Sequence, residues 1–401
     1  MTDADEIVIK QKVLALSTSY PLRENSVAGI FVHNLYRAMS DTWSIEVLCP
    51  DDDKKSGGIL DNIKVTPVRY SLKWMQVLGG SGGILPSLKK NPISLLLLPL
   101  LLLSLFGYTL FKARKVSLIH ANWAICGVIA GLVGKLLGRR VVLTLRGSDI
   151  EKSRSSLAFK WQLQLALACA DFVVCVSKAM MEDVHSTYPK YIGKIGYCHN
   201  GISDAFFNSS RKHRTSDVPI QILAVGGLIP VKGFDLLLEA LHLLPPTSNL
   251  YVTIIGEGPE RAALQMKIKE YSLESKVVLK GEHEYSAIPE IMADADIFIL
   301  SSYAEGRPNV VAEAVASGLP IISSDLPGVN GLVLDGMNGW VFKTGDSIAL
   351  SKAIQHAILN KDALSSMGET GRLMIRKDSA WSVAADYYAA LFNKLLSNSV
   401  K

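Results

Sequence analysis

Residues 305–322 read EGRPNVVAEAVASGLPII, and this stretch decides the fold of the second half of the chain. The apolar run Ile297–Leu300 before it is predicted to be a buried strand, and the run that begins at Pro320 is predicted to be the next strand. Between them the sequence predicts a loop and then a helix over Val310–Ser317, which ends before Gly318. A strand, a helix and a second strand in this order are typical of a parallel sheet covered by helices.

The same alternation extends outward from this stretch. In the first half, apolar runs rich in Val and Ile are predicted as strands: Val13–Leu16, Ile45–Leu48, Ile63–Val68, Leu118–His120, Arg140–Leu145, Asp171–Val176 and Lys194–Cys198. In the second half the predicted strands are Gln221–Val225, Leu250–Ile255, Lys276–Leu279, Ile297–Leu300, Pro320–Ser323 and Trp340–Phe342. The sequence therefore predicts an α/β protein of two doubly wound Rossmann-like domains that face each other across a cleft.

The length of 401 residues suits two domains at about 100–200 residues each. We place the first domain at 1–205 and the second at 219–378. The intervening residues 206–218 are polar and lack apolar periodicity over most of their length, so they are predicted to be a linker. The last residues, 379–401, are predicted to form a helix that packs back toward the first domain.

Composition excludes several classes of protein. Hydrophobic residues make up 49% of the chain, which excludes a mostly disordered protein, and a net charge of +5 with 7% aromatics does not favour nucleic-acid binding. The five cysteines form no CxxC and the histidines form no HExxH, so we expect free thiols, no metal and no cofactor. The acidic start Met1–Glu6 lacks the basic region of a signal peptide, which favours the cytoplasmic side of the membrane.

One segment is far more apolar than the rest: Ile93–Phe111 reads ISLLLLPLLLLSLFGYTLF and carries no charge. Basic residues flank it on both sides: Lys89, Lys90, Lys112, Arg114 and Lys115. Its length approaches the roughly 20 residues that span a bilayer, but Pro99 and Gly107 interrupt it, and a spanning helix would separate strands of one sheet. The other interpretations are a helix pair inside the globule and a surface that docks into one membrane leaflet. Because apolar residues precede it, at Trp74, Met75 and Leu78, we favour docking and expect a membrane surface as a partner.

Two carboxylates belong to the 305–322 stretch. The start of a helix after a strand is an anion site, because its N–H groups are free and its dipole is positive there. Glu305 lies in the loop and Glu313 lies within the helix. Carboxylates at such a place would not bind a phosphate, but they would accept hydrogen bonds from sugar hydroxyls beside it.

EGRPNVVAEAVASGLPII resembles the E-x7-E signature of the retaining glycosyltransferases of family four, which have the GT-B fold. Shorter motifs resemble further segments of that family in the same order: Ala28–Val32 the N-terminal acceptor loop, His120–Trp123 the "HAHW" segment of exopolysaccharide-type members, Asn200–Ile202 "NGI", Val225–Gly233 "VGRL…KG" and Ile255–Pro259 "IGxGP". The resemblance covers nearly the whole chain, and the order and spacing of the motifs are specific.

The resemblance implies a nucleotide-sugar donor, bound mainly by the second domain. Glu313 would bond the ribose hydroxyls, Glu305 would contact the transferred sugar, and Lys232 would neutralise the diphosphate as the bond to the sugar breaks. The implied donor-binding residues are Gly226, Gly227, Lys232, His283, Glu305, Gly306, Arg307, Pro308, Asn309, Val310 and Glu313. Two alternatives stay open: Lys232 is a plain surface lysine, or His283 has no role at the nucleobase.

The chain departs from the family pattern at several positions. Gly227 stands where the family usually has an Arg, so one cation for the diphosphate is missing, and Arg307 is a candidate to replace it. Asn330-Gly331 stands where many members carry Pro-Glu, which suggests altered sugar selectivity or drift. Arg146 stands where many relatives have a His, and a guanidinium cannot act as a base at neutral pH.

Acceptor binding is assigned to Gly29, His120, Arg146 and Asp149. Arg146 is expected to grip an acceptor phosphate, with an ion pair to Asp149 as the alternative. His120 is expected to position the acceptor hydroxyl, and we count it as catalytic together with Lys232 and Glu305. The alternative for His120 is a buried residue with satisfied hydrogen bonds.

The resemblance thus implies a retaining, metal-independent glycosyltransferase. It would move a sugar from a UDP- or GDP-sugar to a lipid-linked or growing glycan for a bacterial surface polysaccharide, as a peripheral protein on the inner face of the plasma membrane. Gly227 keeps open a non-catalytic, membrane-docked relative in a glycan assembly complex. A nucleotide-sugar epimerase of the same fold is the other alternative, and it would need no lipid-docking surface.

Overall fold

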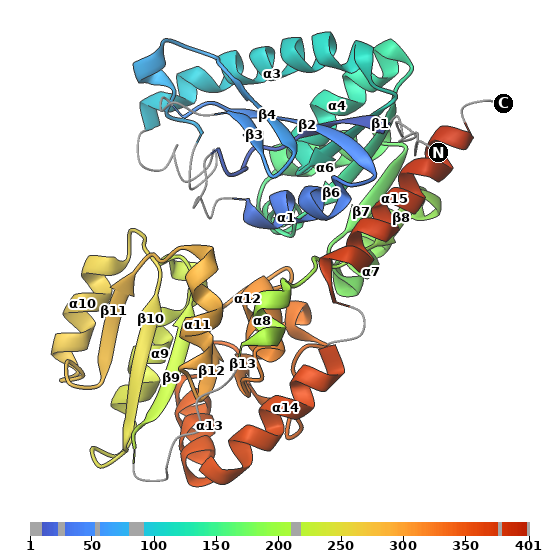
Figure 1. The fold of residues 1–401 in the computed structure, drawn as a ribbon. Coiled ribbons are helices and arrows are strands. Elements are labelled where there is room, and N and C mark those ends of the chain that lie inside the picture. Colours follow the sequence, from blue (N-terminus) through green and yellow to red (C-terminus); the bar gives the residue numbers. More distant parts are fainter. Residues whose placement is uncertain are drawn as a thin grey trace, which may run out of the picture. The chain divides into compact units, whose positions relative to one another are not determined.

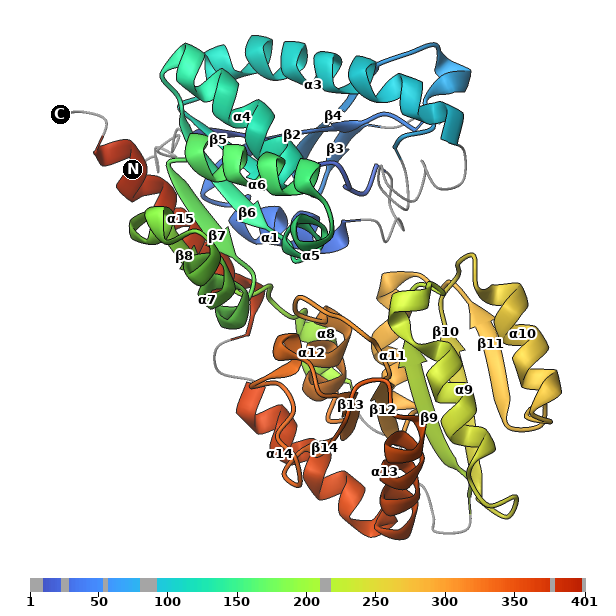
Figure 2. The ribbon, with the colours of Figure 1, turned by 180° about the vertical axis from the view of Figure 1, so that it is seen from behind.

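The computed structural model describes residues 10–22, 29–52, 57–79, 92–209, 218–375 and 379–398. The chain divides into two compact units. The first unit comprises Met1–Gly201 together with Trp381–Lys401, and the second comprises Ile202–Ala380. Figures 1 and 2 show that each unit contains its own sheet with helices packed on it.

The first unit is built on an eight-stranded sheet of order β3-β4-β2-β1-β5-β6-β7-β8. Its strands are β1 (Gln11–Leu16), β2 (Trp43–Pro50), β3 (Gly58–Leu60), β4 (Ile63–Val68), β5 (Leu118–Asn122), β6 (Arg140–Leu145), β7 (Phe172–Cys175) and β8 (Ile195–Tyr197). All neighbours are parallel except the edge strand β3, which is antiparallel to β4. The strand order reverses between β1 and β5, which makes this the switch point of a doubly wound sheet.

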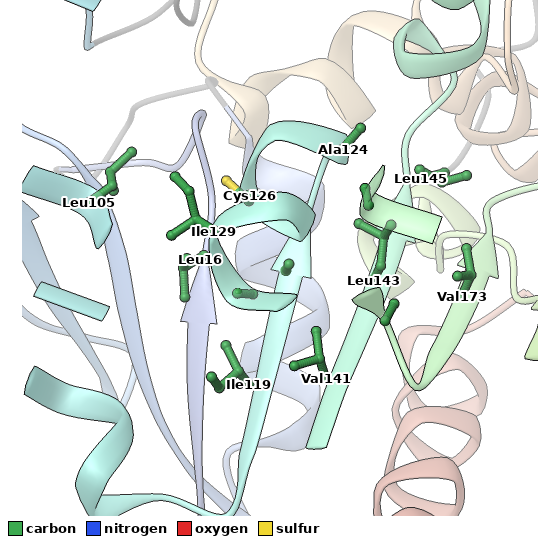
Figure 3. Packing of buried hydrophobic residues seen from close by; sticks show 14 of the residues in the cluster. Leu16, Leu105, Ile119, Ala124, Cys126, Ile129, Val141, Leu143, Leu145 and Val173 are labelled. Atoms are coloured by element: carbon green, nitrogen blue, oxygen red, sulfur yellow. The ribbon is translucent and has the colours of Figure 1, made fainter. Parts of the chain in front are cut away.

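Helices cover both faces of this sheet, so alternate residues of one strand enter different cores. Leu14 and Leu16 of β1 pack with one set of helices, and Val13 and Ala15 pack with the other. The first set is α3 (Leu98–Lys112), α4 (Ala124–Leu137), α5 (Ser148–Ser155), α6 (Leu157–Cys169) and α7 (Lys178–Thr187), and the second is α1 (Ile30–Met39) and α15 (Trp381–Ser397). Figure 3 shows the first core, in which Leu105 of α3 and Ile129 of α4 lie over the strands.

The helices α4 and α6 approach each other closely because glycine stands at their contact. A Cβ on Gly131 of α4 would lie 2.3 Å from the Cβ of Cys169 on α6. No side chain fits in that space. The sequence of α4 therefore brings the two helices side by side over β5 and β6.

The apolar segment Ile93–Phe111 forms a 3-10 turn, η2 (Pro92–Leu97), followed by α3. Pro99 lies in the first turn of α3, where its missing N–H removes no helical hydrogen bond. The helix buries Leu101, Leu105 and Thr109, a stripe at every fourth residue, whereas most of its other side chains reach the surface. Ser94–Lys115 is long and apolar enough to cross a membrane by length and composition, and only 22% of its most apolar window is buried. The alternative of a helix pair enclosed in the globule is therefore wrong.

The residues before this segment divide between core and surface. Trp74 is 72% exposed, but Leu78 is fully buried and Met75 packs partly against the first core. Leu78 was expected on the docking surface, and that expectation is wrong because the side chain belongs to the core. The basic residues Lys89 and Lys90 lie outside the described residues.

The second unit is built on a six-stranded parallel sheet of order β11-β10-β9-β12-β13-β14. Its strands are β9 (Ile220–Val225), β10 (Leu250–Ile255), β11 (Val277–Gly281), β12 (Ile297–Leu300), β13 (Ile321–Ser324) and β14 (Gly339–Phe342). The helices α9 (Phe234–His242), α10 (Arg261–Glu270) and α13 (Ser347–Leu359) pack on one face, and α8 (Asp204–Asn208), α11 (Ile288–Ala293) and α12 (Asn309–Ala316) pack on the other. The long helix α14 (Leu364–Ile375) contributes to both cores.

The prediction of an α/β protein with two doubly wound domains is confirmed, and each predicted strand overlaps an observed one. The edge strand β3 was missed. The expected linker 206–218 begins too early, because Phe206 and Phe207 of α8 are buried in the second unit. Residues 210–217 of that linker lie outside the described residues. The final helix α15 packs against α1 in the first unit.

Candidate active site

The expected donor residues of the second unit lie in loops that follow the carboxyl ends of its parallel strands, and in the helix α12 that one of these loops enters. Lys232 lies in η5 (Pro230–Lys232) after β9, and Glu305 lies in the loop after β12. The strands β9 and β12 are neighbours at the point where the strand order reverses, which is where doubly wound sheets bind their ligands. Lys232 Nζ donates to Glu305 Oε1 at 2.6 Å. The structure thus brings these two expected catalytic residues into direct contact.

This ion pair is largely shielded from water. The Lys232 side chain is 23% exposed and the Glu305 side chain 12%, so Lys232 is not a solvated surface lysine. Ser302 Oγ donates a further hydrogen bond of 2.8 Å to the same Glu305 oxygen. The carboxylate is therefore fixed in position by a cation and a hydroxyl before any ligand is present.

Backbone contacts hold the two loops together. Tyr303 N donates to Val231 O at 2.8 Å, and Ser301 Oγ donates to Lys232 O at 3.1 Å. Gly233 has a φ of 61°, and a Cβ there would lie 2.2 Å from Ser301 O. Only glycine permits this approach. The glycine of the "KG" motif therefore has a structural reason, since it lets η5 lie against the β12 loop.

Glu313 is buried in α12 with one polar partner that the structure describes. Tyr285 OH donates to Glu313 Oε1 at 2.8 Å. Burial raises the pKa of Glu313 to about 7, because the charged carboxylate loses its hydration, and the Tyr285 hydrogen bond opposes this rise only in part. A buried carboxylate with so few donors can accept further hydrogen bonds from hydroxyl groups.

The helix α12 begins at Asn309, at the end of the loop that follows β12. Val311 N donates to Pro308 O at 3.1 Å in the first turn of the helix. Pro308 has no N–H and is the N-cap residue. The loop residues Gly306 and Arg307 lead into this helix start, as expected from the sequence.

The loops after β9 and β11 contain three more expected donor residues. Gly226 and Gly227 follow β9, and His283 follows β11. A Cβ on Gly227 would meet only Glu257 O, at 3.8 Å, so the position has room for a side chain. His283 is half-buried, and its Nδ1 lies 3.4 Å from Gly281 O. Its role at the nucleobase stays a prediction.

In the first unit Arg146 follows β6 and lies among neutral partners. Its Nη1 donates to Asn200 Oδ1 at 2.7 Å, and its Nη2 and Nε donate to Asn122 Oδ1 at 2.6 and 3.2 Å. The guanidinium lies over the Phe31 ring, 5.1 Å from its centroid. No described carboxylate lies within ion-pair distance of it. The described hydrogen-bond partners of Arg146 are therefore neutral, and the nearby Asp149 acts on its charge only through space.

Asp149 does not pair with the Arg146 side chain, so the alternative of a structural ion pair is wrong. Its carboxylate accepts from the backbone N–H groups of Ala124, at 2.8 Å, and Arg146, at 3.0 Å. Asp149 thus ties the loop after β6 to the start of α4. Each of its oxygens accepts one backbone hydrogen bond, and its expected role in acceptor binding stays a prediction.

His120 is wholly buried in β5. Its Nδ1 is hydrogen-bonded to Tyr36 OH at 2.9 Å and its Nε2 to Thr144 Oγ1 at 2.8 Å. Burial, and then the charge of Arg146, lower the pKa of His120 to about 3, so the ring is neutral at neutral pH. Both ring nitrogens are occupied. This geometry fits the alternative of a satisfied buried histidine and not the expected contact with an acceptor hydroxyl.

Gly29 is the N-cap of α1, with a φ of 68°. A Cβ there would lie 2.2 Å from Ser19 O, so glycine is needed for the turn itself. Residue 28 of the expected acceptor loop lies outside the described residues.

Sequence reasoning missed four residues that complete these sites: Ser302, Tyr285, Asn122 and Asn200. Asn122 and Asn200 belong to the HANW and NGI segments, so a signal was present. No pattern in the sequence marks Ser302 or Tyr285 as partners of the two glutamates.

Comparison with known proteins agrees with this geometry. Residues 28–206 match the family described as "Glycosyltransferase Family 4", and residues 206–374 match "Glycosyl transferases group 1". The chain is similar to an uncharacterised glycosyltransferase of Methanocaldococcus jannaschii, with 24% identity over 277 residues, which are 68% of this chain and 74% of the relative. It is also similar to the amylovoran biosynthesis glycosyltransferase AmsK of Erwinia amylovora, with 28% identity over 248 residues, which are 60% of each chain.

Among solved structures, the Anabaena protein HepE, crystallised with UDP and glucose, has a TM-score of 0.74 with 18% identity and covers 96% of this chain and 100% of its own. This likeness concerns the fold. The two family matches adjoin at residue 206, and the second contains both glutamates of the E-x7-E signature. The chain therefore belongs to the glycosyltransferases of family four and has their GT-B fold.

Proposed function

We propose that this protein transfers a sugar from a UDP-sugar to an acceptor that carries a phosphate, with retention at the anomeric carbon, in the synthesis of a surface polysaccharide. The Lys232–Glu305 pair at the switch point of the second sheet is the observation that carries the proposal. The complex of HepE with UDP and glucose supports the choice of nucleotide, and the name of the Erwinia relative supports the choice of pathway class.

Donor binding is assigned to the second unit. The N–H groups at the start of α12 and the Lys232 ammonium would meet the diphosphate, and Glu305 would accept hydrogen bonds from the sugar. Glu313 would accept from the ribose hydroxyls. As the bond between the anomeric carbon and the diphosphate oxygen breaks, Lys232 stabilises the negative charge on the leaving group. The acceptor oxygen bonds the same face of the sugar, and its proton passes to the leaving diphosphate.

Acceptor binding is assigned to the first unit, at Arg146. A guanidinium is charged at any physiological pH and presents paired donors that suit phosphate oxygens. The described acceptors of its hydrogen bonds are two neutral amide oxygens, so a phosphate would supply a directly bonded counter-charge. An acceptor sugar on a lipid diphosphate, or on a growing phosphorylated glycan, has this chemistry.

A thermal-shift screen tests the donor. The protein is melted with UDP, GDP, ADP and their sugar conjugates, alongside Glu313→Ala and the exposed control Glu284→Ala. A ligand at about 100 times its Kd stabilises by about 2.7 kcal/mol, which raises the Tm by several degrees. We expect UDP and a UDP-sugar to stabilise the wild type and the control but not Glu313→Ala. If no nucleotide raises the Tm, the proposed donor site is wrong and a non-catalytic relative is favoured.

A further inference from the structure

Three helices of the first unit form one layer on one face of its sheet. The helix α4 packs against α3 on one side and against α6 on the other (Figures 1 and 2). All three bury their inner side chains in the same core. Their outer sides therefore belong to one continuous surface, which we call the α3–α4–α6 face.

This face exposes large apolar side chains on each of the three helices. On α6 they are Leu157, Trp161 and Leu165, spaced at every fourth residue, and the first two are 76% and 69% exposed. On α4 the exposed apolar residues are Leu132 and Leu136, and on α3 with η2 they are Leu95, Leu96, Leu100, Leu103, Tyr108 and Phe111. Single exposed leucines are ordinary, but an apolar surface that continues over three neighbouring helices marks an interaction site.

The part of the sequence that forms α3 and α4 is rich in basic residues. Residues 62–148 contain twelve Lys and Arg and no Asp or Glu. The rest of the chain, with 30 basic residues against 37 acidic ones, is net negative, so the net charge of +5 comes from this part of the sequence. The helix α6 adds Lys160 and no carboxylate. Four of these cations are exposed on or beside the face: Arg114, Lys115, Lys135 and Lys160.

We propose that the α3–α4–α6 face docks this enzyme on an anionic membrane leaflet. Exposed apolar side chains with exposed cations among and beside them match the acyl boundary and the phosphate groups of such a leaflet. The proposal goes beyond a docking segment at Ile93–Phe111, because it includes α4 and α6 and leaves out Leu78, Leu97, Leu101 and Leu105, which are buried. It rests on the proposed function only in that a lipid-linked acceptor would lie in the same membrane.

The packing of α3 argues against a spanning helix. Leu101, Leu105 and Thr109 are buried in the first core, and Lys112 Nζ donates to Glu46 Oε1 on β2 at 2.8 Å. To cross a bilayer α3 would have to leave these partners. Docking in the plane of the membrane keeps all of them and buries only the outer side chains.

Flotation with vesicles tests the face. The full-length protein is mixed with vesicles of phosphatidylcholine alone, or of equal parts phosphatidylcholine and phosphatidylglycerol, without donor or acceptor. Two double variants probe separate helices: Leu157→Ser with Trp161→Ser on α6, and Leu96→Ser with Leu103→Ser on η2 and α3. The control pair is Leu359→Ser with Met266→Ser in the second unit, whose side chains are 76% and 66% exposed.

We expect the wild type to bind the anionic vesicles only. Either face variant should bind these vesicles roughly tenfold more weakly or worse, and the control pair should bind them like the wild type. Lys135→Glu with Lys160→Glu should also weaken binding, whereas Lys269→Glu on α10 should not. If the α6 variant binds like the wild type, the three-helix face is wrong. Equal binding to neutral vesicles, or a face that instead joins two copies of the chain in solution, would also overturn the proposal. Because no substrate is present, failure here leaves the proposed sugar transfer untouched, and failure of the nucleotide screen leaves docking untouched.

Discussion

The Lys232 ammonium lies 2.6 Å from the Glu305 carboxylate, and the two residues follow the neighbouring strands between which the order of the second sheet reverses. The pair is therefore placed by the topology of the sheet and not by local sequence, since 73 residues separate its members. In the proposed reaction the two groups have different tasks. The ammonium stabilises the leaving diphosphate, and the carboxylate orients the sugar.

Lys232→Met is expected to lower kcat by roughly 100- to 1000-fold, because one donor to a developing negative charge is lost. It also leaves Glu305 shielded without its cation, so the Tm should fall. Adding Glu305→Gln should recover the Tm but not the activity. Single-turnover transfer and thermal melts measure these effects, with the exposed Lys269→Met as control. A double variant as active as the wild type would contradict the assignment.

Glu313 predicts a pH dependence of both affinity and stability. Its pKa is raised from 4.5 to about 7, so between these values the folded protein holds a proton that the unfolded chain releases. Stability therefore falls as pH rises through this window, and the cost above the folded pKa is at most about 3 kcal/mol. Ribose hydroxyls need the ionised carboxylate, so nucleotide affinity should fall as pH drops below the pKa.

Glu313→Gln should separate these two effects. We expect the variant to have a higher Tm than the wild type at about pH 8 and nearly the same Tm at about pH 4.5. Its nucleotide binding should be weaker and should no longer differ between these two pH values. Melting curves and calorimetric titrations with UDP measure this. If the variant is less stable than the wild type at the higher pH, the buried carboxylate is stabilised by a group other than Tyr285.

Gly227→Arg is expected to improve donor binding. The family usually has an Arg there, and a Cβ at this position would meet nothing closer than Glu257 O at 3.8 Å. A guanidinium that reaches the diphosphate should lower the Kd for UDP by roughly tenfold or more. Gly227→Gln, of similar length but neutral, is the matched control. If the Arg and Gln variants bind alike, the missing cation is not what limits this site.

Much of the fold follows from the sequence, because buried parallel strands are apolar runs and their helices have clear ends. The E-x7-E stretch was interpretable for the same reason, since a strand, a loop and a helix follow one another locally. His120 and Asp149 were assigned to the acceptor because their neighbours in sequence resemble a motif. Most of their hydrogen-bond partners are distant in sequence, namely Tyr36 and Thr144 for His120 and the backbone of Ala124 for Asp149, and no local pattern reveals them.

Local sequence patterns also do not reveal which side chains reach the surface of the first unit. Hydropathy marks Ile93–Phe111 but does not distinguish Leu96, which is 77% exposed, from Leu101, which is buried. The exposed apolar residues of α6, which are Leu157, Trp161 and Leu165, lie in a less apolar stretch of sequence and were not predicted to be a docking surface. Which side of a helix meets the sheet is decided by tertiary packing, so only the structure assigns Trp161 to the surface.

Arg146 gives the last prediction, because its present partners are neutral. Asn200→Asp would place a carboxylate where an amide oxygen now accepts from Nη1 at 2.7 Å. The new ion pair should keep or raise the Tm, while the charge available to an acceptor phosphate is neutralised. We expect KM for a phosphorylated acceptor to rise roughly 10- to 100-fold, as for the loss of one charged hydrogen bond, with the Kd for UDP unchanged. Asn200→Ala, which removes the contact but keeps the positive charge, should bind the acceptor better than Asn200→Asp. Equal KM values for the two variants would mean that the charge of Arg146 does not hold the acceptor.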